Sequence, residues 1–157
     1  MTARWTPGQA VIDRLLAEGR LERVPANRQL ADEYLRQASA HLATSRLAAG
    51  RDAVGEFQLA YDAARKALAA ILLNQGLRPT SKGGHVVVER AAFAQLGASH
   101  QKIIKPFSWM RPLRNDSEYP SADRPVAASE DAEEARRGAQ GIVDAVVRLL
   151  DEMGPYG

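Results

Sequence analysis

The residues best suited to binding chemistry lie in one short segment, WMRPLRNDSEYP, at residues 109–120. Arg111 and Arg114 are three residues apart, so in a helix they share one face, and each guanidinium offers paired donors to a phosphate. Asn115 can hydrogen-bond a base or a sugar, and Tyr119 can stack on a base or donate its hydroxyl. The segment therefore predicts a site for RNA or a nucleotide.

Positive charge continues upstream of the arginines, at Lys102 and Lys105. This patch is the sole electrostatic indication of nucleic acid, because the net charge of the whole chain is only +2. We therefore include Lys105 in the predicted binding set, together with Arg111, Arg114, Asn115 and Tyr119.

A simpler interpretation of the same segment needs no ligand. Glu118 follows Arg114 by four residues, and an ion pair at this spacing on a solvated helix contributes only about 0.3–0.5 kcal/mol. On this interpretation, the carboxylate of Glu118 occupies the guanidinium. The nearby Phe107 and Trp109 fit either a core or the wall of a groove, and the sequence leaves both open.

Metal, thiol and P-loop chemistry find no support in the sequence. The chain has no cysteine, which excludes disulfides, thiolate catalysis and cysteine-bound zinc. None of the three histidines, His41, His85 and His100, follows an acidic residue by three positions, so the Glu-x-x-His pattern of di-metal bundles is absent. We expect no metal and no cofactor, and we interpret His85 and His100 as surface or helix-end residues and Lys82 as part of a solvated loop.

The composition indicates a helical, globular protein. Apolar residues make up 45% of the 157 residues and charged residues 25%, which argues against disorder of the whole chain. Alanine occurs 28 times, whereas valine, isoleucine and threonine together occur 19 times, so strand-forming residues are scarce. No apolar run reaches the ~20 residues that span a bilayer, and residues 1–25 do not resemble a signal peptide, so we expect a cytoplasmic protein.

Helical periodicity recurs along the chain and predicts an antiparallel up-down four-helix bundle with an additional short N-terminal helix. Thr6, Asn27 and Ser129 stand where helix caps are expected. The expected helices cover residues 6–19, 27–50, 52–75, 85–96 and 129–150, with breaks at Pro106 and Pro112, and loops at residues 77–84 and 120–125. The corresponding division is a short N-terminal helix and connector at residues 1–24, a bundle at 25–152 and a loose tail at 153–157.

The segment RNDSEYP follows a helical hairpin that contains LAYDAARKALAAILLNQGLRPTS, and this arrangement resembles the HEPN superfamily, the nucleotide-binding domain of higher eukaryotes and prokaryotes. The resemblance covers residues 29–150 and rests mainly on the RN-x-x-EY pattern before the last helix. It implies a small helical bundle. Many members of that family are metal-independent ribonucleases with an arginine, then a polar residue, then a histidine a few positions later.

Arg114 and Asn115 match the first half of that ribonuclease motif, but Tyr119 stands where the histidine is expected. A histidine with a pKa of ~6.5 accepts a proton at neutral pH, whereas a phenol with a pKa of ~10 is ionised in only about one molecule in a thousand. Glu118 is the only other proton acceptor nearby. The resemblance therefore implies RNA or nucleotide binding with weak or absent ribonuclease activity, and a catalytic set of Arg114, Asn115, Tyr119 and Glu118 if cleavage persists.

Two functional hypotheses follow from the resemblance. The first is an RNA- or nucleotide-binding homodimer that belongs to a toxin–antitoxin or phage-defence system, in which the motif-bearing helices of two copies face each other. The second is a protein-interaction module that pairs with a cognate partner such as an antitoxin or a nucleotidyltransferase, with the RNDSEYP segment setting the geometry of the dimer. Neither hypothesis involves a membrane.

Overall fold

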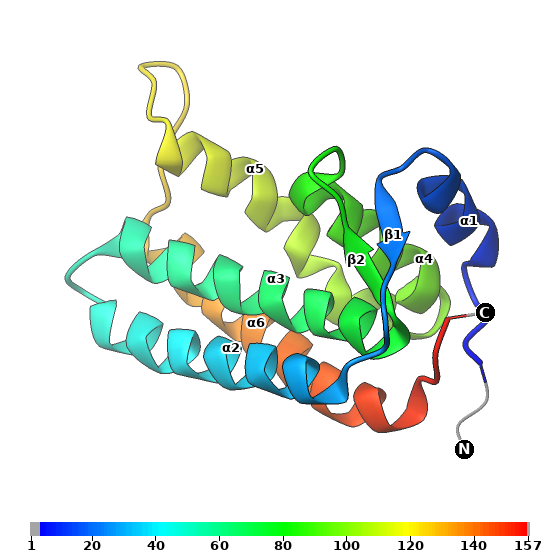
Figure 1. Cartoon of the computed structure of the whole chain (residues 1–157). Coiled ribbons are helices and arrows are strands. Elements are labelled where there is room, and N and C mark those ends of the chain that lie inside the picture. Colours follow the sequence, from blue (N-terminus) through cyan, green and yellow to red (C-terminus); the bar gives the residue numbers. More distant parts are fainter. Residues whose placement is uncertain (1–3, 157) are drawn as a thin grey trace.

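The computed structural model describes residues 4–156, apart from the side chain of His85, and this part of the chain is all-α with one very small sheet (Figure 1). The predicted surface position of the His85 side chain therefore lies outside the described residues. The helices are α1 (Gln9–Ala17), α2 (Arg28–Ala48), α3 (Ala53–Gln75), α4 (Gly84–Ile104), α5 (Pro106–Glu118) and α6 (Ser129–Glu152), and the strands are β1 (Leu21–Arg23) and β2 (Leu77–Pro79). The all-α fold class is confirmed.

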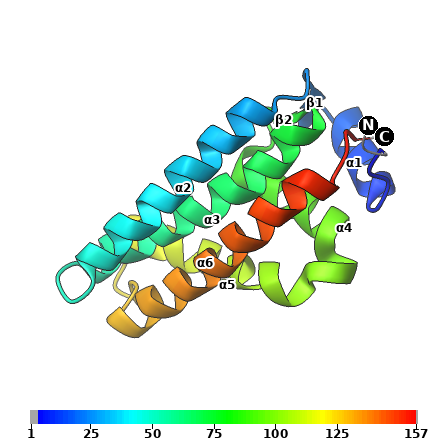
Figure 2. The ribbon, with the colours of Figure 1, turned by 90° about the horizontal axis from the view of Figure 1, so that it is seen from below.

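Helix α3 forms the centre of the bundle and contacts α2, α4, α5 and α6. Figure 2 shows α2, α3 and α6 running side by side along the length of the molecule. Alanine side chains on α3, including Ala60, Ala63, Ala64 and Ala67, are completely buried, and their small size lets neighbouring helices approach closely. Within residues 4–156, no helix combines the length and the apolar character that crossing a membrane requires.

The hairpin of α2 and α3 begins and ends where its sequence predicts. The Oδ1 atom of Asn27 accepts a hydrogen bond from the Leu30 N–H at 2.9 Å and caps α2. Asp52 caps α3 in the same way, through Gly55. Gly76 ends α3 in the left-handed conformation with φ of 82°, where a Cβ atom would lie 2.8 Å from the carbonyl oxygen of Val24.

The two other predicted caps are wrong in detail. Helix α1 begins at Gln9 after a left-handed Gly8, so Thr6 lies outside it. Helix α6 does begin at Ser129, but this residue is its first helical position, and the preceding Ala128 donates its N–H to the carboxylate of Asp131. Backbone geometry and an acidic residue in the first turn therefore replace the expected hydroxyl caps.

The segment from Gly97 to Pro112 is more helical than its glycine and its two prolines predict. Gly97 does not end α4, which continues to Ile104 because Leu96 and Ile104 are buried on the core side. His100 adopts a non-helical conformation, so α4 bends there. The predicted break falls at Pro106, where α5 begins, but Pro112 lies inside α5 and starts no new helix. The carbonyl that Pro112 leaves without a helical partner belongs to the exposed Ser108.

The predicted loop at residues 77–84 contains an unexpected strand. β2 pairs antiparallel with β1, with Glu22 opposite Arg78, and the Arg78 guanidinium binds the Glu22 carboxylate at 2.6 Å. Leu21 and Leu77 are buried beneath the pair. Strands of three residues are too short for a periodic pattern in the sequence, which explains why the prediction missed them.

The C-terminal tail, predicted to be loose, is packed against the N-terminal part of the chain, and Figure 1 shows the red segment after α6 beside the blue segment before α1. Tyr156 is 3% exposed and forms a bridge with Trp5, and its hydroxyl donates to the carboxylate of Asp13. Desolvation and this hydrogen bond raise the pKa of Tyr156 to about 12. The tail therefore closes the end of the bundle at which α1 lies.

Candidate nucleic-acid interface

Helix α5 carries most of the predicted site, and two buried residues fix it to the bundle. The ring of Phe107 stacks on the ring of Tyr61 of α3, with a centroid distance of 5.1 Å and an interplanar angle of 11°. Met110 is buried one turn later, where α5 passes close to Gly138 of α6. At the other end of α5, the buried hydroxyl of Ser117 accepts a hydrogen bond from the Ala127 N–H and holds the following loop. The polar residues of α5 are thus presented by a rigid helix.

Arg114 reaches Tyr61 of α3 and has no acidic partner in the described part of the chain. Its guanidinium carbon lies 5.7 Å from the centre of the Tyr61 ring, which is within the range of a cation–π contact. Its Nε atom is buried and has no hydrogen-bond partner within residues 4–156, and its Nη1 atom donates one long hydrogen bond, of 3.4 Å, to the side-chain oxygen of Asn115. The predicted pair with Glu118 does not form, because Glu118 accepts a hydrogen bond from Gln58 instead at 2.6 Å.

Arg111 lies one turn before Arg114 but already has a carboxylate partner. Its Nε donates to the Oε2 atom of Glu89 on α4 at 2.8 Å, and the Glu89 side chain is only 14% exposed. This ion pair connects α5 to α4. Both arginines were predicted to bind phosphate. In the described chain, a carboxylate neutralises the guanidinium of Arg111 but none neutralises that of Arg114.

The remaining predicted residues fall into two separate places. Asn115 and Tyr119 line a surface hollow of about 460 Å³ at the end of α5, and the Tyr119 side chain is 75% exposed. Arg124 also lines this hollow and binds Asp116 at 3.3 Å. Lys105, by contrast, precedes α5 by one residue, nine positions before Arg114, which places it ~13 Å away along the helix axis. The structure therefore does not bring Lys105 into the same cluster.

Two cations that the prediction missed lie on α3, in the turn that follows Tyr61. Arg65 follows Tyr61 by one turn of α3, and its Nε atom is buried without a hydrogen-bond partner in the described chain. Burial raises the pKa of the Tyr61 hydroxyl, and three guanidiniums lie close enough to oppose this rise, those of Arg114, Arg65 and Arg111. The adjacent Lys66 points toward α2. In the sequence, Arg65 and Lys66 interrupt an alanine-rich stretch of a largely buried helix. Two cations at such positions could have been recognised as candidate site residues.

Lys66 is held by neutral groups of α2. Its ammonium group donates to the side-chain oxygen of Gln37 at 2.8 Å and lies 2.8 Å from Nε2 of His41. Burial and the charge of Lys66 lower the pKa of His41, so this histidine is neutral at physiological pH. His100, the other histidine with a described side chain, contacts Ser99 at the bend of α4, away from this cluster.

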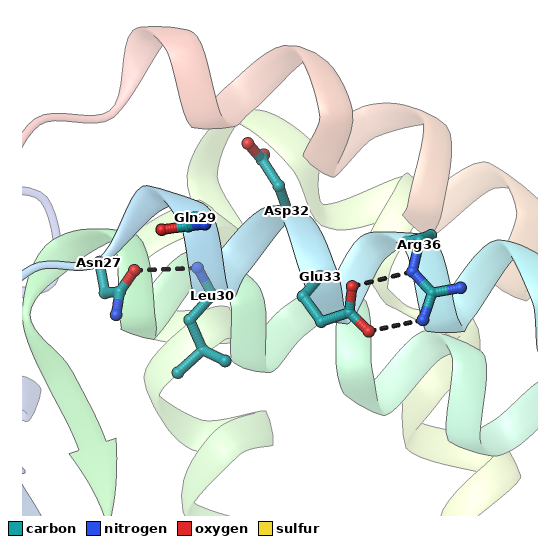
Figure 3. A pocket seen from close by; sticks show the side chains of 6 residues that line it. All are labelled: Asn27, Gln29, Leu30, Asp32, Glu33 and Arg36. Atoms are coloured by element: carbon teal, nitrogen blue, oxygen red, sulfur yellow. Dashed lines mark hydrogen bonds and ion pairs between the residues drawn. The ribbon is translucent and has the colours of Figure 1, made fainter.

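A different hollow, on the first turns of α2, offers no comparable chemistry (Figure 3). Its charged residues are already paired: Arg36 binds Glu33 through two hydrogen bonds, at 2.6 and 2.8 Å, and Asp32 binds Arg28 at 2.9 Å. Hydrogen bonds from Arg36 and Gln37 lower the pKa of Glu33 to about 2. No group of three potential metal ligands occurs in the described part of the chain.

The fold and the site define a small helical bundle that presents an arginine–asparagine pair before its last helix. The family model of the HEPN domain matches residues 31–150, and the chain belongs to this family. The match includes α3, α5 and α6 up to residue 150, and therefore every residue discussed for the site. No curated protein and no solved structure gives a significant match.

Proposed function

We propose that this HEPN-domain protein binds RNA or a nucleotide through the surface formed by α5 and α3, with weak or absent ribonuclease activity. The observation that carries the proposal is the half-buried guanidinium of Arg114, which lies over the Tyr61 ring without any carboxylate partner in the described chain. A partly desolvated cation without a counter-ion is stabilised when an anion binds to it, and a phosphate fits the donor geometry of a guanidinium. In this proposal Arg114 contacts a phosphate, Asn115 orients the sugar or base, and the exposed Tyr119 stacks on a base.

The same residues explain why cleavage is weak or absent. In cleavage, the ribose 2′-oxygen attacks the adjacent phosphorus and the bond from phosphorus to the 5′-oxygen of the next nucleotide breaks. This step requires one group to remove the 2′-hydroxyl proton and a proton for the departing 5′-oxygen, while Arg114 stabilises the negative charge of the transition state. No histidine follows Arg114 in the sequence, and a phenol is a poor base at neutral pH. Both carboxylates of α5 already have partners, because Glu118 accepts a hydrogen bond from Gln58 and Asp116 binds Arg124.

Two assays test the proposal directly. Wild-type protein and Arg114→Ala are incubated with RNA in EDTA, and we expect little or no cleavage from either. Binding of RNA and of a mononucleotide is then measured at two salt concentrations, and Arg114→Ala should weaken both, with a shallower dependence on salt. Arg137→Ala is the matched control, because Arg137 is exposed on α6 and paired with Glu133. If Arg114→Ala and Arg111→Ala both leave the affinities unchanged, the binding function is wrong.

A second candidate is a protein-interaction module, which the ion pair between Arg111 and Glu89 favours. This pair uses one of the two arginines to join α5 to α4, as a scaffold residue would. The exposed Tyr119 at the end of α5 would then contact a second copy of the chain, or a partner such as an antitoxin or a nucleotidyltransferase. We propose that the protein is a homodimer within a toxin–antitoxin or phage-defence system. Light scattering after size exclusion tests the dimer, and a stoichiometric protein partner recovered without RNA would favour this second function.

A further inference from the structure

The described chain contains five half-buried lysine or arginine side chains, and four of them lie on α3 and α5. They are Arg65 and Lys66 of α3 and Arg111 and Arg114 of α5, and the fifth is Arg136 of α6. Arg136 binds Glu56 at 3.2 Å and Arg111 binds Glu89 at 2.8 Å. Lys66 and Arg114 are the two for which the described chain supplies no carboxylate.

Arg65 is held only loosely. Its nearest carboxylate is that of Asp62 on the preceding turn, at 3.6 Å from Nε, which is too long for a hydrogen bond. Its side chain is 22% exposed, so most of it has left water without gaining a close partner. Such a guanidinium can exchange the contact with Asp62 for a stronger one with a phosphate.

These cations form a series that crosses the molecule. Helix α3 lies between α5 and α2 (Figure 1) and contacts both. Arg114 reaches α3 from α5 at Tyr61, Arg65 lies one turn further along α3, and Lys66 faces His41 on α2. Since Lys66 is five residues after Tyr61, the two side chains point ~140° apart around the α3 axis. One phosphate held by Arg114 over the Tyr61 ring therefore cannot also neutralise Lys66.

We propose that Arg65 and Lys66 form a second phosphate subsite, so that the ligand is a single-stranded RNA oligonucleotide with at least two phosphates, running from α5 across α3 toward α2. The inference rests on the proposed function, because it extends the Arg114 site. Gln37 and His41 position the Lys66 ammonium group through the two contacts of 2.8 Å and leave its charge unneutralised. The carboxylate of Asp62 lies beside these cations and repels phosphate, so it limits how closely the RNA strand approaches this subsite.

The length of the ligand and its dependence on salt test the second subsite. Affinities of a uridine mononucleotide and of a uridine octanucleotide are measured over a range of salt concentrations for wild type, Lys66→Gln, Arg65→Gln and Arg114→Gln. Lys66→Gln and Arg65→Gln should each weaken octanucleotide binding several-fold and reduce the slope of log affinity against log salt by about 0.7, the value for one lost phosphate contact on a single strand. Lys66→Gln should not change the affinity for the mononucleotide, because Lys66 points ~140° away from Tyr61 around the α3 axis. Arg114→Gln should weaken both ligands.

Two further variants separate charge from folding. Lys66→Arg keeps the positive charge and should restore the salt slope of the octanucleotide. Lys82→Gln removes an exposed lysine of the turn before α4 and should leave the slope as in wild type. If Arg114→Gln weakens binding but Lys66→Gln and Arg65→Gln do not, the second subsite is wrong and the proposed function stands. If Arg114→Gln has no effect either, the proposed function fails. If Lys66→Gln is the one variant that weakens oligonucleotide binding, the nucleic acid binds to α2 and α3 alone, which also contradicts the proposed function.

Discussion

The ion pair between Arg111 and Glu89 restrains a cation at the edge of the proposed site, and Glu89→Gln should release it. The Nε–Oε2 distance of 2.8 Å and the 14% exposure of Glu89 indicate a charge-assisted hydrogen bond that is mostly shielded from water, while Arg111 remains 35% exposed. Hydrogen bonds to charged groups contribute about 1.5–3 kcal/mol, and the exposure of Arg111 reduces this value toward its lower end. We therefore expect Glu89→Gln to lower the free energy of unfolding by ~1.5 kcal/mol, which corresponds to a fall in melting temperature of about 3–6 °C.

The same substitution should strengthen binding of RNA. Without the carboxylate, the Arg111 guanidinium is free to follow Arg114 onto a phosphate, so the affinity should rise several-fold and the salt slope should steepen by ~0.7. Stability is measured by thermal unfolding and affinity by fluorescence anisotropy with a labelled RNA oligonucleotide. In the Arg111→Gln background, Glu89→Gln should no longer change the affinity.

A fall in melting temperature with no change in affinity or salt slope would refute this reasoning. Arg111 would then serve only to join α5 to α4, and the protein-interaction function would gain support. A rise in affinity that persists without Arg111 would also contradict it, because the cause would then be the lost negative charge of Glu89 rather than a new contact.

Three further predictions concern the helices that position the site. Because burial and the charge of Lys66 lower the pKa of His41, the unfolded chain binds more protons than the folded chain below pH ~6.5. The free energy of unfolding should therefore fall as pH decreases from about 7 to 5, and His41→Gln should flatten this dependence in urea titrations at several pH values. Gly76→Ala places a Cβ atom 2.8 Å from the Val24 carbonyl oxygen in a left-handed residue and should cost about 2 kcal/mol or more, seen as a lower urea midpoint. Phe107→Ala removes the aromatic stack between α5 and α3 and should cost ~3–5 kcal/mol; an unchanged melting temperature would contradict the anchoring of α5.

Much of the bundle was predictable from the sequence because helical periodicity and caps are local signals. The limits of α2 and α3 follow from Asn27, Asp52 and Gly76, which act on their own neighbours in the chain. The mistaken end of α4 at Gly97 shows the limit of such signals. A glycine weakens a helix by only ~1 kcal/mol, and burial of Ile104 at the end of α4 offsets that cost.

The pairings within the site were less predictable, because they depend on which helices meet. A spacing of four residues predicts a pair between Arg114 and Glu118, yet Gln58, sixty positions away in the sequence, binds the carboxylate instead. The partner of Arg111 lies on α4. Lys105 belongs to the same basic segment of the sequence but lies well along the helix from the other cations. Contacts of this kind require the tertiary arrangement, whereas residue types alone identified Arg114 and Asn115.

The environment of Arg114 distinguishes a binding role from a purely structural one. A residue whose only task was to cover the Tyr61 ring would do so better as leucine or methionine, because burying part of a guanidinium without a counter-ion is unfavourable. The cation–π contact recovers about 0.5–2 kcal/mol of that cost, and the unpartnered Nε atom recovers none. Binding an anion requires mainly a permanent positive charge in a fixed position, and Arg114 provides one by itself. Cleavage demands in addition a group that exchanges a proton near neutral pH, and α5 has a tyrosine where that group would stand. The chemistry of this surface is therefore suited to holding a phosphate and poorly suited to breaking the bond beside it.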